Sequence, residues 1–290
     1  MKFYNREKEL EEMEFLNRKK PSFLVITGKR RIGKTRLITH FLEQKVRNGL
    51  YFFVDDKKNE RLLVKEYLDI LKKIVEIPPF IKIDTIEELI ELIFDLSKKK
   101  DLVVVFDEFQ RFLKINPSIV NQMQKAWDLK AKKNKVFLIT SGSNLGMIKK
   151  IFIEEGAPLF KRADNMIKLR ELEFSTVYQI LRDLKVRNFE EIMKIFFLFG
   201  GVPYYYQLME KYEVKNFESV VGKLLLGEFA PLGNEVQDVL VEEFGRAYST
   251  YYEILNALAN GRNTKKEMAD WVHVAETSLS PYLKDLIELV

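Results

Sequence analysis

One octapeptide near the N-terminus constrains the fold more than any other feature of this chain. It reads Gly28-Lys-Arg-Arg-Ile-Gly-Lys34-Thr35 and fits the pattern G-x-x-x-x-G-K-[ST], between the apolar run 23–27 and an amphipathic stretch. The glycines let the backbone wrap a phosphate group, and a helix N-terminus that follows the loop favours anions. The pattern therefore predicts strand, loop and helix in succession, with Lys34 reaching the β- and γ-phosphates and Thr35 placing its hydroxyl on Mg²⁺.

The whole loop is expected to contact the nucleotide, because its backbone N–H groups point inward. The expected contacts are Gly28, Lys29, Arg30, Arg31, Ile32, Gly33, Lys34, Thr35 and Arg36.

A second apolar run ends in two carboxylates, Leu102-Val-Val-Val-Phe-Asp107-Glu108. This is the Walker B arrangement, in which Asp107 would hold Mg²⁺ through water and Glu108 would orient or deprotonate the attacking water. A strand that ends in solvated acids is the simpler alternative. The phosphate-loop pattern upstream favours the functional interpretation.

Two further positions are weaker candidates. After the apolar run 136–140, Ser143 could sense the γ-phosphate, or it could belong to a simple polar turn. Arg162 could be an arginine finger that completes a site in cis or in trans, or it could be a solvated side chain.

Apolar strands and amphipathic helices alternate through the first half of the chain, which predicts an α/β fold with a parallel sheet covered on both faces. The expected strands are 23–27, 50–54, 102–106, 136–140 and 166–169, and the expected helices are 6–19, 60–75, 85–98 and 118–130. Strands cease after about residue 173, and helices are expected at 176–184, 189–199 and 202–212. The predicted domains are a core at 1–172, a helical lid at 173–233 and a helical segment at 234–290.

The C-terminal segment shows a helix-turn-helix pattern with helices expected at 252–259, 264–272 and 280–289. Ser280 would cap the third helix and Pro281 would lie in its first turn. That helix carries one basic residue, Lys284, and two acidic ones, Asp285 and Glu288, so its surface is not basic. A protein contact is therefore favoured over DNA binding. A β-wing would be expected after residue 290, so the segment is interpreted as a short or truncated winged helix.

Composition excludes several classes of site. The chain has no cysteine and two histidines, which argues against disulfides, thiolate zinc sites, cysteine nucleophiles and histidine-built metal centres. The N-terminus lacks a signal-like apolar core, and the longest uncharged run, 195–209, is too short to span a bilayer. A cytoplasmic protein is therefore expected. The net charge of +5 favours an ordinary solvated surface over a nucleic-acid footprint.

These residues together resemble an archaeal-type ATPase of the STAND group of AAA+-related P-loop proteins. The N-terminal segment is similar to the group's hhGRExE signature, with Asn5 where Gly is usual. The other matching segments are the phosphate loop, Asp107-Glu108-Phe-Gln110, Gly142-Ser143-Asn144 (similar to Gly-Ser-Ser), Pro158-Leu-Phe-Lys-Arg162 (similar to Pro-Leu-Tyr-Gly-Arg) and Gly200-Gly-Val-Pro203 (similar to Gly-x-Pro).

The resemblance implies an AAA+-like core, a helical lid and a winged-helix segment, with ATP or ADP and Mg²⁺ as ligands. It also implies that Arg6 and Pro203 lie near the adenine. From the residues alone, Pro203 marks only a break between two helices. No guanine-reading Asn/Thr-Lys-x-Asp motif follows the fourth strand, which favours adenine.

Three functions are compatible with this sequence. The leading hypothesis is a nucleotide-dependent switch with slow ATPase activity, acting on another protein or through self-association. The alternative is a DNA-binding or DNA-processing ATPase that uses the C-terminal helix-turn-helix. A third is a scaffold that binds nucleotide without hydrolysing it.

Overall fold

The computed structural model describes residues 1–78 and 81–289. By its internal contacts the chain divides into two compact units, Met1–Leu181 with Phe199–Gln207 and Arg182–Leu198 with Leu208–Val290. The phosphate loop and the two carboxylates predicted for the site all lie in the first unit. The predicted boundaries after residues 172 and 233 stay a prediction, and the predicted end at residue 290 lies outside the described residues.

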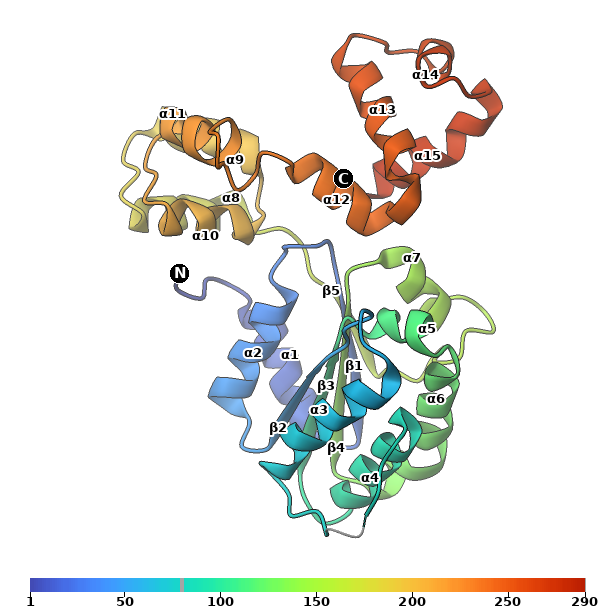
Figure 1. The fold of residues 1–290 in the computed structure, drawn as a ribbon. Helices are drawn as coiled ribbons and strands as arrows, with labels where there is room; N and C mark the ends of the chain where they lie inside the picture. Colours follow the sequence, from blue (N-terminus) through green and yellow to red (C-terminus); the bar gives the residue numbers. More distant parts are fainter. Residues whose placement is uncertain (79–80, 290) are drawn as a thin grey trace. The chain divides into compact units, whose positions relative to one another are not determined.

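The first unit is built on a parallel five-stranded sheet with the order β2-β3-β4-β1-β5 (Figure 1). The strands are β1 (Ser22–Thr27), β2 (Gly49–Phe53), β3 (Leu102–Asp107), β4 (Val136–Gly142) and β5 (Asn165–Lys168). Every residue of β1, β3 and β4 is buried, as their continuous apolar runs predict. The α/β fold with a parallel sheet is thereby confirmed, and all five strands lie within two residues of their expected positions.

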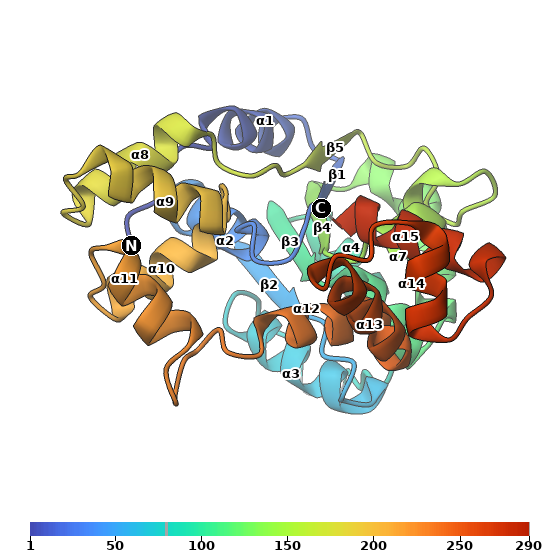
Figure 2. The same ribbon diagram turned by 90° about the horizontal axis from the view of Figure 1, so that it is seen from above.

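Helices cover both faces of this sheet. On one face α1 (Glu7–Arg18) and α2 (Lys34–Lys45) contribute Met13, Leu37 and Phe41 to a core with β1, β3 and β4. On the other face lie α3 (Glu60–Lys72), α4 (Ile86–Ser97) and α6 (Ser118–Lys130). Figure 2, seen from above, shows the strands between α1 on one side and α3 on the other. The five helices confirm the expected 3.6-residue patterns.

The sequence did not predict α12 (Glu235–Phe244) or three single-turn helices, α5 (Phe112–Ile115), α7 (Leu145–Ile148) and α11 (Phe217–Val220). The four residues of a single-turn helix are too few to show a helical period, so only contacts in the fold define these three helices.

The helices after β5 are α8 (Phe174–Asp183), α9 (Phe189–Phe199), α10 (Pro203–Lys211) and α11 (Phe217–Val220). Gly200, with φ 56°, follows α9 directly, and Pro203 is the first residue of α10. A left-handed glycine after one helix and a proline at the start of the next are common helix stop and start signals. The predicted helix break between residues 199 and 203 is confirmed.

The C-terminal segment has α12 (Glu235–Phe244), α13 (Tyr248–Ala259), α14 (Lys265–Val272) and α15 (Glu276–Leu289) around a small core of its own. Thr264 and Glu267 form a capping box at the start of α14. Three residues, 273–275, join α14 to α15, and His273 there has φ 58°. The segment therefore contains the predicted pair of helices joined by a tight turn.

The predicted start of the last helix was wrong. α15 begins at Glu276, so Ser280 is not its cap and Pro281 lies inside the helix, beyond the first turn. Leu279 explains the difference, because its side chain is fully buried in the C-terminal core. Burial of this leucine outweighs the lost N–H of Pro281 and draws residues 276–280 into the helix.

Within the described residues, no helix is both long enough and apolar enough to cross a membrane.

Candidate active site

The phosphate loop joins β1 to α2 through two glycines with positive φ, Gly28 at 152° and Gly33 at 98°. A Cβ on Gly28 would lie 2.6 Å from the Leu169 carbonyl oxygen, so this position requires glycine for space as well as for conformation. The Lys34 side chain is buried, and its Nζ donates to the carbonyl oxygens of Gly28 at 2.9 Å and Lys29 at 3.0 Å. The ammonium group therefore lies within the curve of the loop, where it can meet an anion.

The Asp107 carboxylate ends β3 and is buried, and four protein donors converge on it. Thr35 Oγ1 donates to Oδ2 at 2.7 Å, and the Tyr51 hydroxyl donates to the same oxygen. Ser141 Oγ and the Glu108 backbone N–H donate to Oδ1. Burial, reinforced by the negative charge of Asp107, raises the pKa of Tyr51 far above its usual value and keeps this hydroxyl a donor. The carboxylate is thus fixed in orientation beside Thr35.

The next residue, Glu108, has the left-handed φ of 59°, which turns its side chain away from the strand. Gln110 Nε2 donates to Glu108 Oε2 at 2.6 Å, and Ser143 Oγ donates to the same oxygen at 2.9 Å. The structure therefore brings Ser143 to Glu108. It also adds Gln110, which sequence reasoning quoted only as part of a motif.

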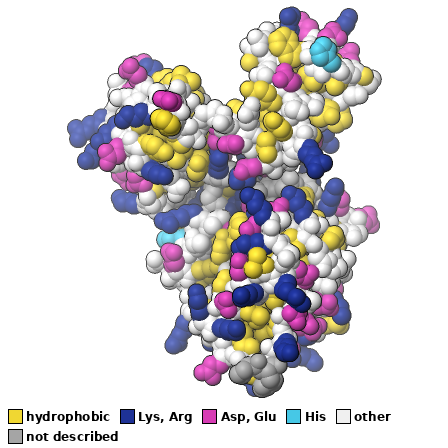
Figure 3. All heavy atoms as spheres, in the orientation of Figure 1, with side chains coloured by type: hydrophobic (Ala, Val, Ile, Leu, Met, Phe, Trp, Pro, Cys, Tyr) yellow, Lys and Arg dark blue, Asp and Glu magenta, His cyan; other side chains and the backbone are white. Residues whose placement is uncertain are grey.

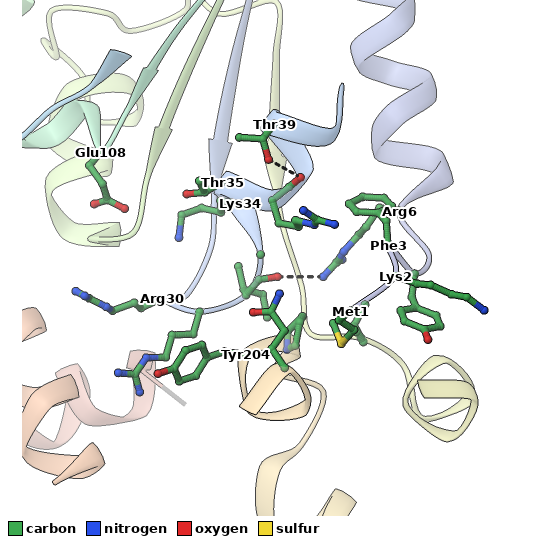
Figure 4. Close-up of a pocket in the computed structure, with 18 of the residues that line it drawn as sticks. Met1, Lys2, Phe3, Arg6, Arg30, Lys34, Thr35, Thr39, Glu108 and Tyr204 are labelled. Carbon is green, nitrogen blue, oxygen red and sulfur yellow. Dashed lines mark hydrogen bonds between the residues drawn. The ribbon is translucent and has the colours of Figure 1, made fainter. Parts of the chain in front are cut away.

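A cavity of about 590 Å³ opens at the carboxyl end of β1 and β3 (Figure 4). Figure 4 shows Glu108 at one end, Lys34 and Thr35 at the start of α2, and Arg6 with Phe3 at the other end. The residues around it are Met1, Lys2, Phe3, Tyr4, Arg6, Arg30, Arg31, Ile32, Gly33, Lys34, Thr35, Arg36, Thr39, Phe53, Glu108, Arg111, Leu172, Pro203, Tyr204 and Gln207.

This cavity suits an anionic ligand of nucleotide size. Among the described residues that line it, seven are Lys or Arg and one, Glu108, is a carboxylate. Its volume is in the range of small-molecule and cofactor sites. Most of the loop residues predicted to bind nucleotide line the cavity. Gly28 and Lys29 do not, and Lys29 Nζ instead pairs with Glu171 at 3.2 Å.

Arg6 joins the N-terminal segment to the phosphate loop. Its guanidinium donates to the carbonyl oxygens of Arg170 at 2.6 Å and Ile32 at 3.5 Å and pairs with Glu9 at 3.1 Å. Asn5, which stands where the resembling family has Gly, has φ 56°, a conformation that Asn tolerates better than most residues. Its side-chain amide also donates to Thr176 at 2.9 Å, which helps to hold the turn.

Pro203 reaches the cavity from the start of α10. Its Cγ lies 3.9 Å from the point where a Cβ on Gly33 would be. The next residue, Tyr204, has the Arg31 guanidinium over its ring at 4.5 Å. Tyr204 was missed by sequence reasoning, and its place directly after the proline was the available signal.

Arg162 lies elsewhere. Its Nε and NH2 contact the Asp128 carboxylate at 3.0–3.3 Å, and NH1 donates to the Phe160 carbonyl oxygen at 2.9 Å. It does not line the cavity, so within one chain the fold does not bring it to the site. Its use as a finger in trans stays a prediction. Arg111, three residues after Glu108, does line the cavity and was missed.

The oxygen ligands at this site suit Mg²⁺ better than a metal ion that is held by protein ligands alone. Mg²⁺ is usually held by one or two protein oxygens together with substrate phosphates. The Thr35 hydroxyl and the Asp107 carboxylate, 2.7 Å apart, form such a pair. Over the described part of the chain, no group of three or more His, Cys, Asp or Glu side chains could hold a metal ion.

Comparison with known proteins supports this assignment of the loop and strands. The family described as an ATPase domain predominantly from Archaea matches residues 3–209. An uncharacterised protein of Methanocaldococcus jannaschii, MJECL04, is 29% identical over 288 residues, which are 99% of this chain and 61% of the relative. The chain thus spans about three-fifths of the length of that relative.

Solved structures share the fold at low sequence identity. The Walker-type ATPase PABY2304 of Pyrococcus abyssi has a TM-score of 0.72 at 19% identity, over 99% of this chain and 90% of that one. The ORC2 protein of Aeropyrum pernix, solved with ADPNP and ADP, has a TM-score of 0.63 at 14% identity, over 99% and 87%. The ORC1 protein of the same organism, solved in complex with DNA, has a TM-score of 0.56 at 16% identity, over 99% and 84%.

Proposed function

The chain belongs to the family of ATPase domains found predominantly in Archaea, and from this premise we propose that it is a nucleotide-dependent molecular switch that binds ATP with Mg²⁺ and hydrolyses it slowly. The observation that carries the proposal is the convergence of Lys34, Thr35 and Glu108 on one cationic cavity, with Asp107 hydrogen-bonded to Thr35. The residues proposed to bind phosphate, to hold Mg²⁺ and to act as the general base thus meet at one edge of the sheet.

Each residue has a distinct role in this proposal. Lys34 binds the β- and γ-phosphates, and the N-terminus of α2 attracts their charge. Thr35 and Asp107 hold Mg²⁺, which when bound neutralises phosphate charge. Pro203 and the N-terminal segment with Arg6 flank the adenine base of the nucleotide.

Hydrolysis then needs one proton transfer and one displacement. Glu108 takes a proton from the attacking water, whose oxygen forms a bond to the γ-phosphorus. The bond from that phosphorus to the bridging oxygen breaks, ADP keeps the electron pair, and inorganic phosphate leaves. Gln110 and Ser143 both engage Oε2 of Glu108, so they orient the carboxylate and leave Oε1 to accept the proton.

Calorimetric titration with ATP and Mg²⁺ tests the binding step. Lys34→Ala should weaken binding about 100-fold or more, because hydrogen bonds to charged groups contribute about 1.5–3 kcal/mol each and Lys34 would make at least two. Lys45→Ala is the matched control, since Lys45 lies in the last turn of the same helix and pairs with Glu14 at 3.0 Å. Equal affinity in Lys34→Ala and wild type would remove the loop from its role.

The switch would act by changing contacts with another protein or with a second copy of this chain when ATP is exchanged or hydrolysed. This part of the proposal follows from the resemblance to STAND ATPases. A cytoplasmic location stays a prediction from the sequence. A nucleotide-dependent change in the elution volume of the purified protein would support self-association.

A DNA-processing ATPase is the second candidate. It is favoured by the likeness in fold to the ORC1 protein solved with DNA and by the tight turn between α14 and α15. The charge of this segment argues against it, because Figure 3 shows Lys and Arg mixed with Asp and Glu on the visible face of the C-terminal helices. DNA affinity measured at several salt concentrations decides between them. A DNA-binding protein should show strong binding at low salt that falls steeply as salt rises.

A further inference from the structure

We propose that Arg111 supplies, in cis, the cation that stabilises the transferring γ-phosphoryl group, an inference that rests on the proposed function. Arg111 ends the short 3₁₀ turn Phe109–Arg111 that directly follows Asp107 and Glu108. The left-handed φ of Glu108 and a hydrogen bond from the Arg111 N–H to the Glu108 carbonyl oxygen, 2.9 Å, curl this turn back. Both side chains consequently face the same cavity.

The contacts of Arg111 position its guanidinium without using up its donors. Its Cζ lies 5.2 Å from the centroid of the Phe53 ring, and NH1 donates to the Val54 carbonyl oxygen at 3.4 Å. Its ion pairs are long, 3.8 Å from Nε to Glu108 Oε2 and 4.0 Å from NH1 to Asp56. NH2 has no hydrogen-bond partner among the residues that the structure describes. An arginine has five N–H donors, so most of them remain for a ligand.

The neighbouring cations do not offer the same arrangement. Lys114, on the next turn, pairs with Asp56 at 2.9 Å, is largely exposed and does not line the cavity. Arg162 is held by Asp128 outside the cavity. Arg31 lines the cavity but stacks on Tyr204. Arg111 is the cavity-lining arginine that lies within one turn of Glu108, the proposed general base.

This position matches the charge that develops during the reaction. As water attacks and the bridging oxygen leaves with its electron pair, negative charge is shared among the γ-phosphoryl oxygens and the bridging oxygen. A guanidinium beside Glu108 can donate to those oxygens from the side on which water attacks. Its planar fork suits phosphoryl oxygens, and lysine does not reproduce that geometry.

Supply of the cation in cis has a kinetic consequence. An arginine finger increases the rate of phosphoryl transfer by about 10³–10⁵-fold. If each chain carries its own, turnover per molecule is independent of protein concentration. A finger donated in trans, by Arg162 or another residue, would instead make turnover rise with concentration.

Binding of ADP with Mg²⁺, measured by calorimetry with and without aluminium fluoride, tests this assignment. Aluminium fluoride mimics the transferring phosphoryl group, so wild type should bind ADP more tightly in its presence. Arg111→Ala should bind ADP alone within about twofold of wild type and lose most of that gain, with Arg111→Lys recovering little of it. Lys114→Ala is the matched control and should keep both affinities.

Each result has a defined meaning. The assignment would be overturned if Arg111→Ala kept the full increase in ADP affinity that aluminium fluoride causes. It would also be overturned if wild type bound ADP but no more tightly with aluminium fluoride, because a cation in cis is available in every copy. Failure of wild type to bind ADP at all would instead refute the proposed function. Intact ADP binding by Arg111→Ala shows that this variant is folded.

Discussion

Gly142→Ala should damage hydrolysis without touching a group that contacts the nucleotide. Gly142 ends β4, and a Cβ there would lie 2.4 Å from Gln110 Oε1 and 2.5 Å from Ile148 Cδ1. Real Cβ atoms do not approach other heavy atoms this closely, so the buried Gln110 amide must move. Gln110 then loses its 2.6 Å hydrogen bond to Glu108 Oε2.

The size of the effect follows from these contacts. Overpacking of a filled interior costs about 1–3 kcal/mol, which corresponds to a loss of roughly 2–12 °C in Tm for a unit of this size. Misplacement of a reacting group by about 1 Å can cost up to roughly 100-fold in rate. We therefore expect kcat to fall by about 10–100-fold while the affinity for ATP stays within about twofold.

Steady-state ATPase kinetics, calorimetry with ATP and a thermal melt measure these three quantities. Gly222→Ala is the control, because nothing lies within 4 Å of a Cβ at that position. It should leave kcat unchanged and lower the Tm little, if at all. If Gly142→Ala keeps wild-type kcat although its Tm falls, the orientation of Glu108 by Gln110 is not needed for hydrolysis.

Two further substitutions test other parts of the chain. Glu108→Gln should keep ATP affinity and lower kcat by about 10²–10⁴-fold, because the amide cannot accept the water proton. Asp69→Asn is its control, since Asp69 lies exposed on α3, pairs with Lys72 and does not line the cavity. Equal turnover in Glu108→Gln and wild type would remove Glu108 from its role. Leu279→Ala should destabilise the C-terminal helices by about 2–5 kcal/mol, since this fully buried side chain leaves a cavity. Hydrogen exchange should then speed up in α13–α15, and unchanged protection there would contradict the burial that places Leu279 inside α15.

The sequence predicted the five strands and most of the longer helices, in their order, because each of these carries a local signal. Continuous apolar runs marked β1, β3 and β4, and the 3.6-residue period marked α6 at its observed bounds. The last helix was misjudged, because Pro281 is a strong local signal for a helix start and the burial of Leu279 is visible only in three dimensions.

For the site, the sequence by itself determined the groups whose spacing is local: the loop from Gly28 to Thr35 and the adjacent carboxylates of Asp107 and Glu108. The tertiary structure alone decided which distant residues join them. Tyr51 meets Asp107 because β2 pairs in register with β3, and Arg111 instead of Arg162 reaches the cavity because a left-handed Glu108 turns the chain back. The physical reason is that a short motif specifies its own backbone, whereas a hydrogen bond between remote residues depends on the register and turns of the whole fold.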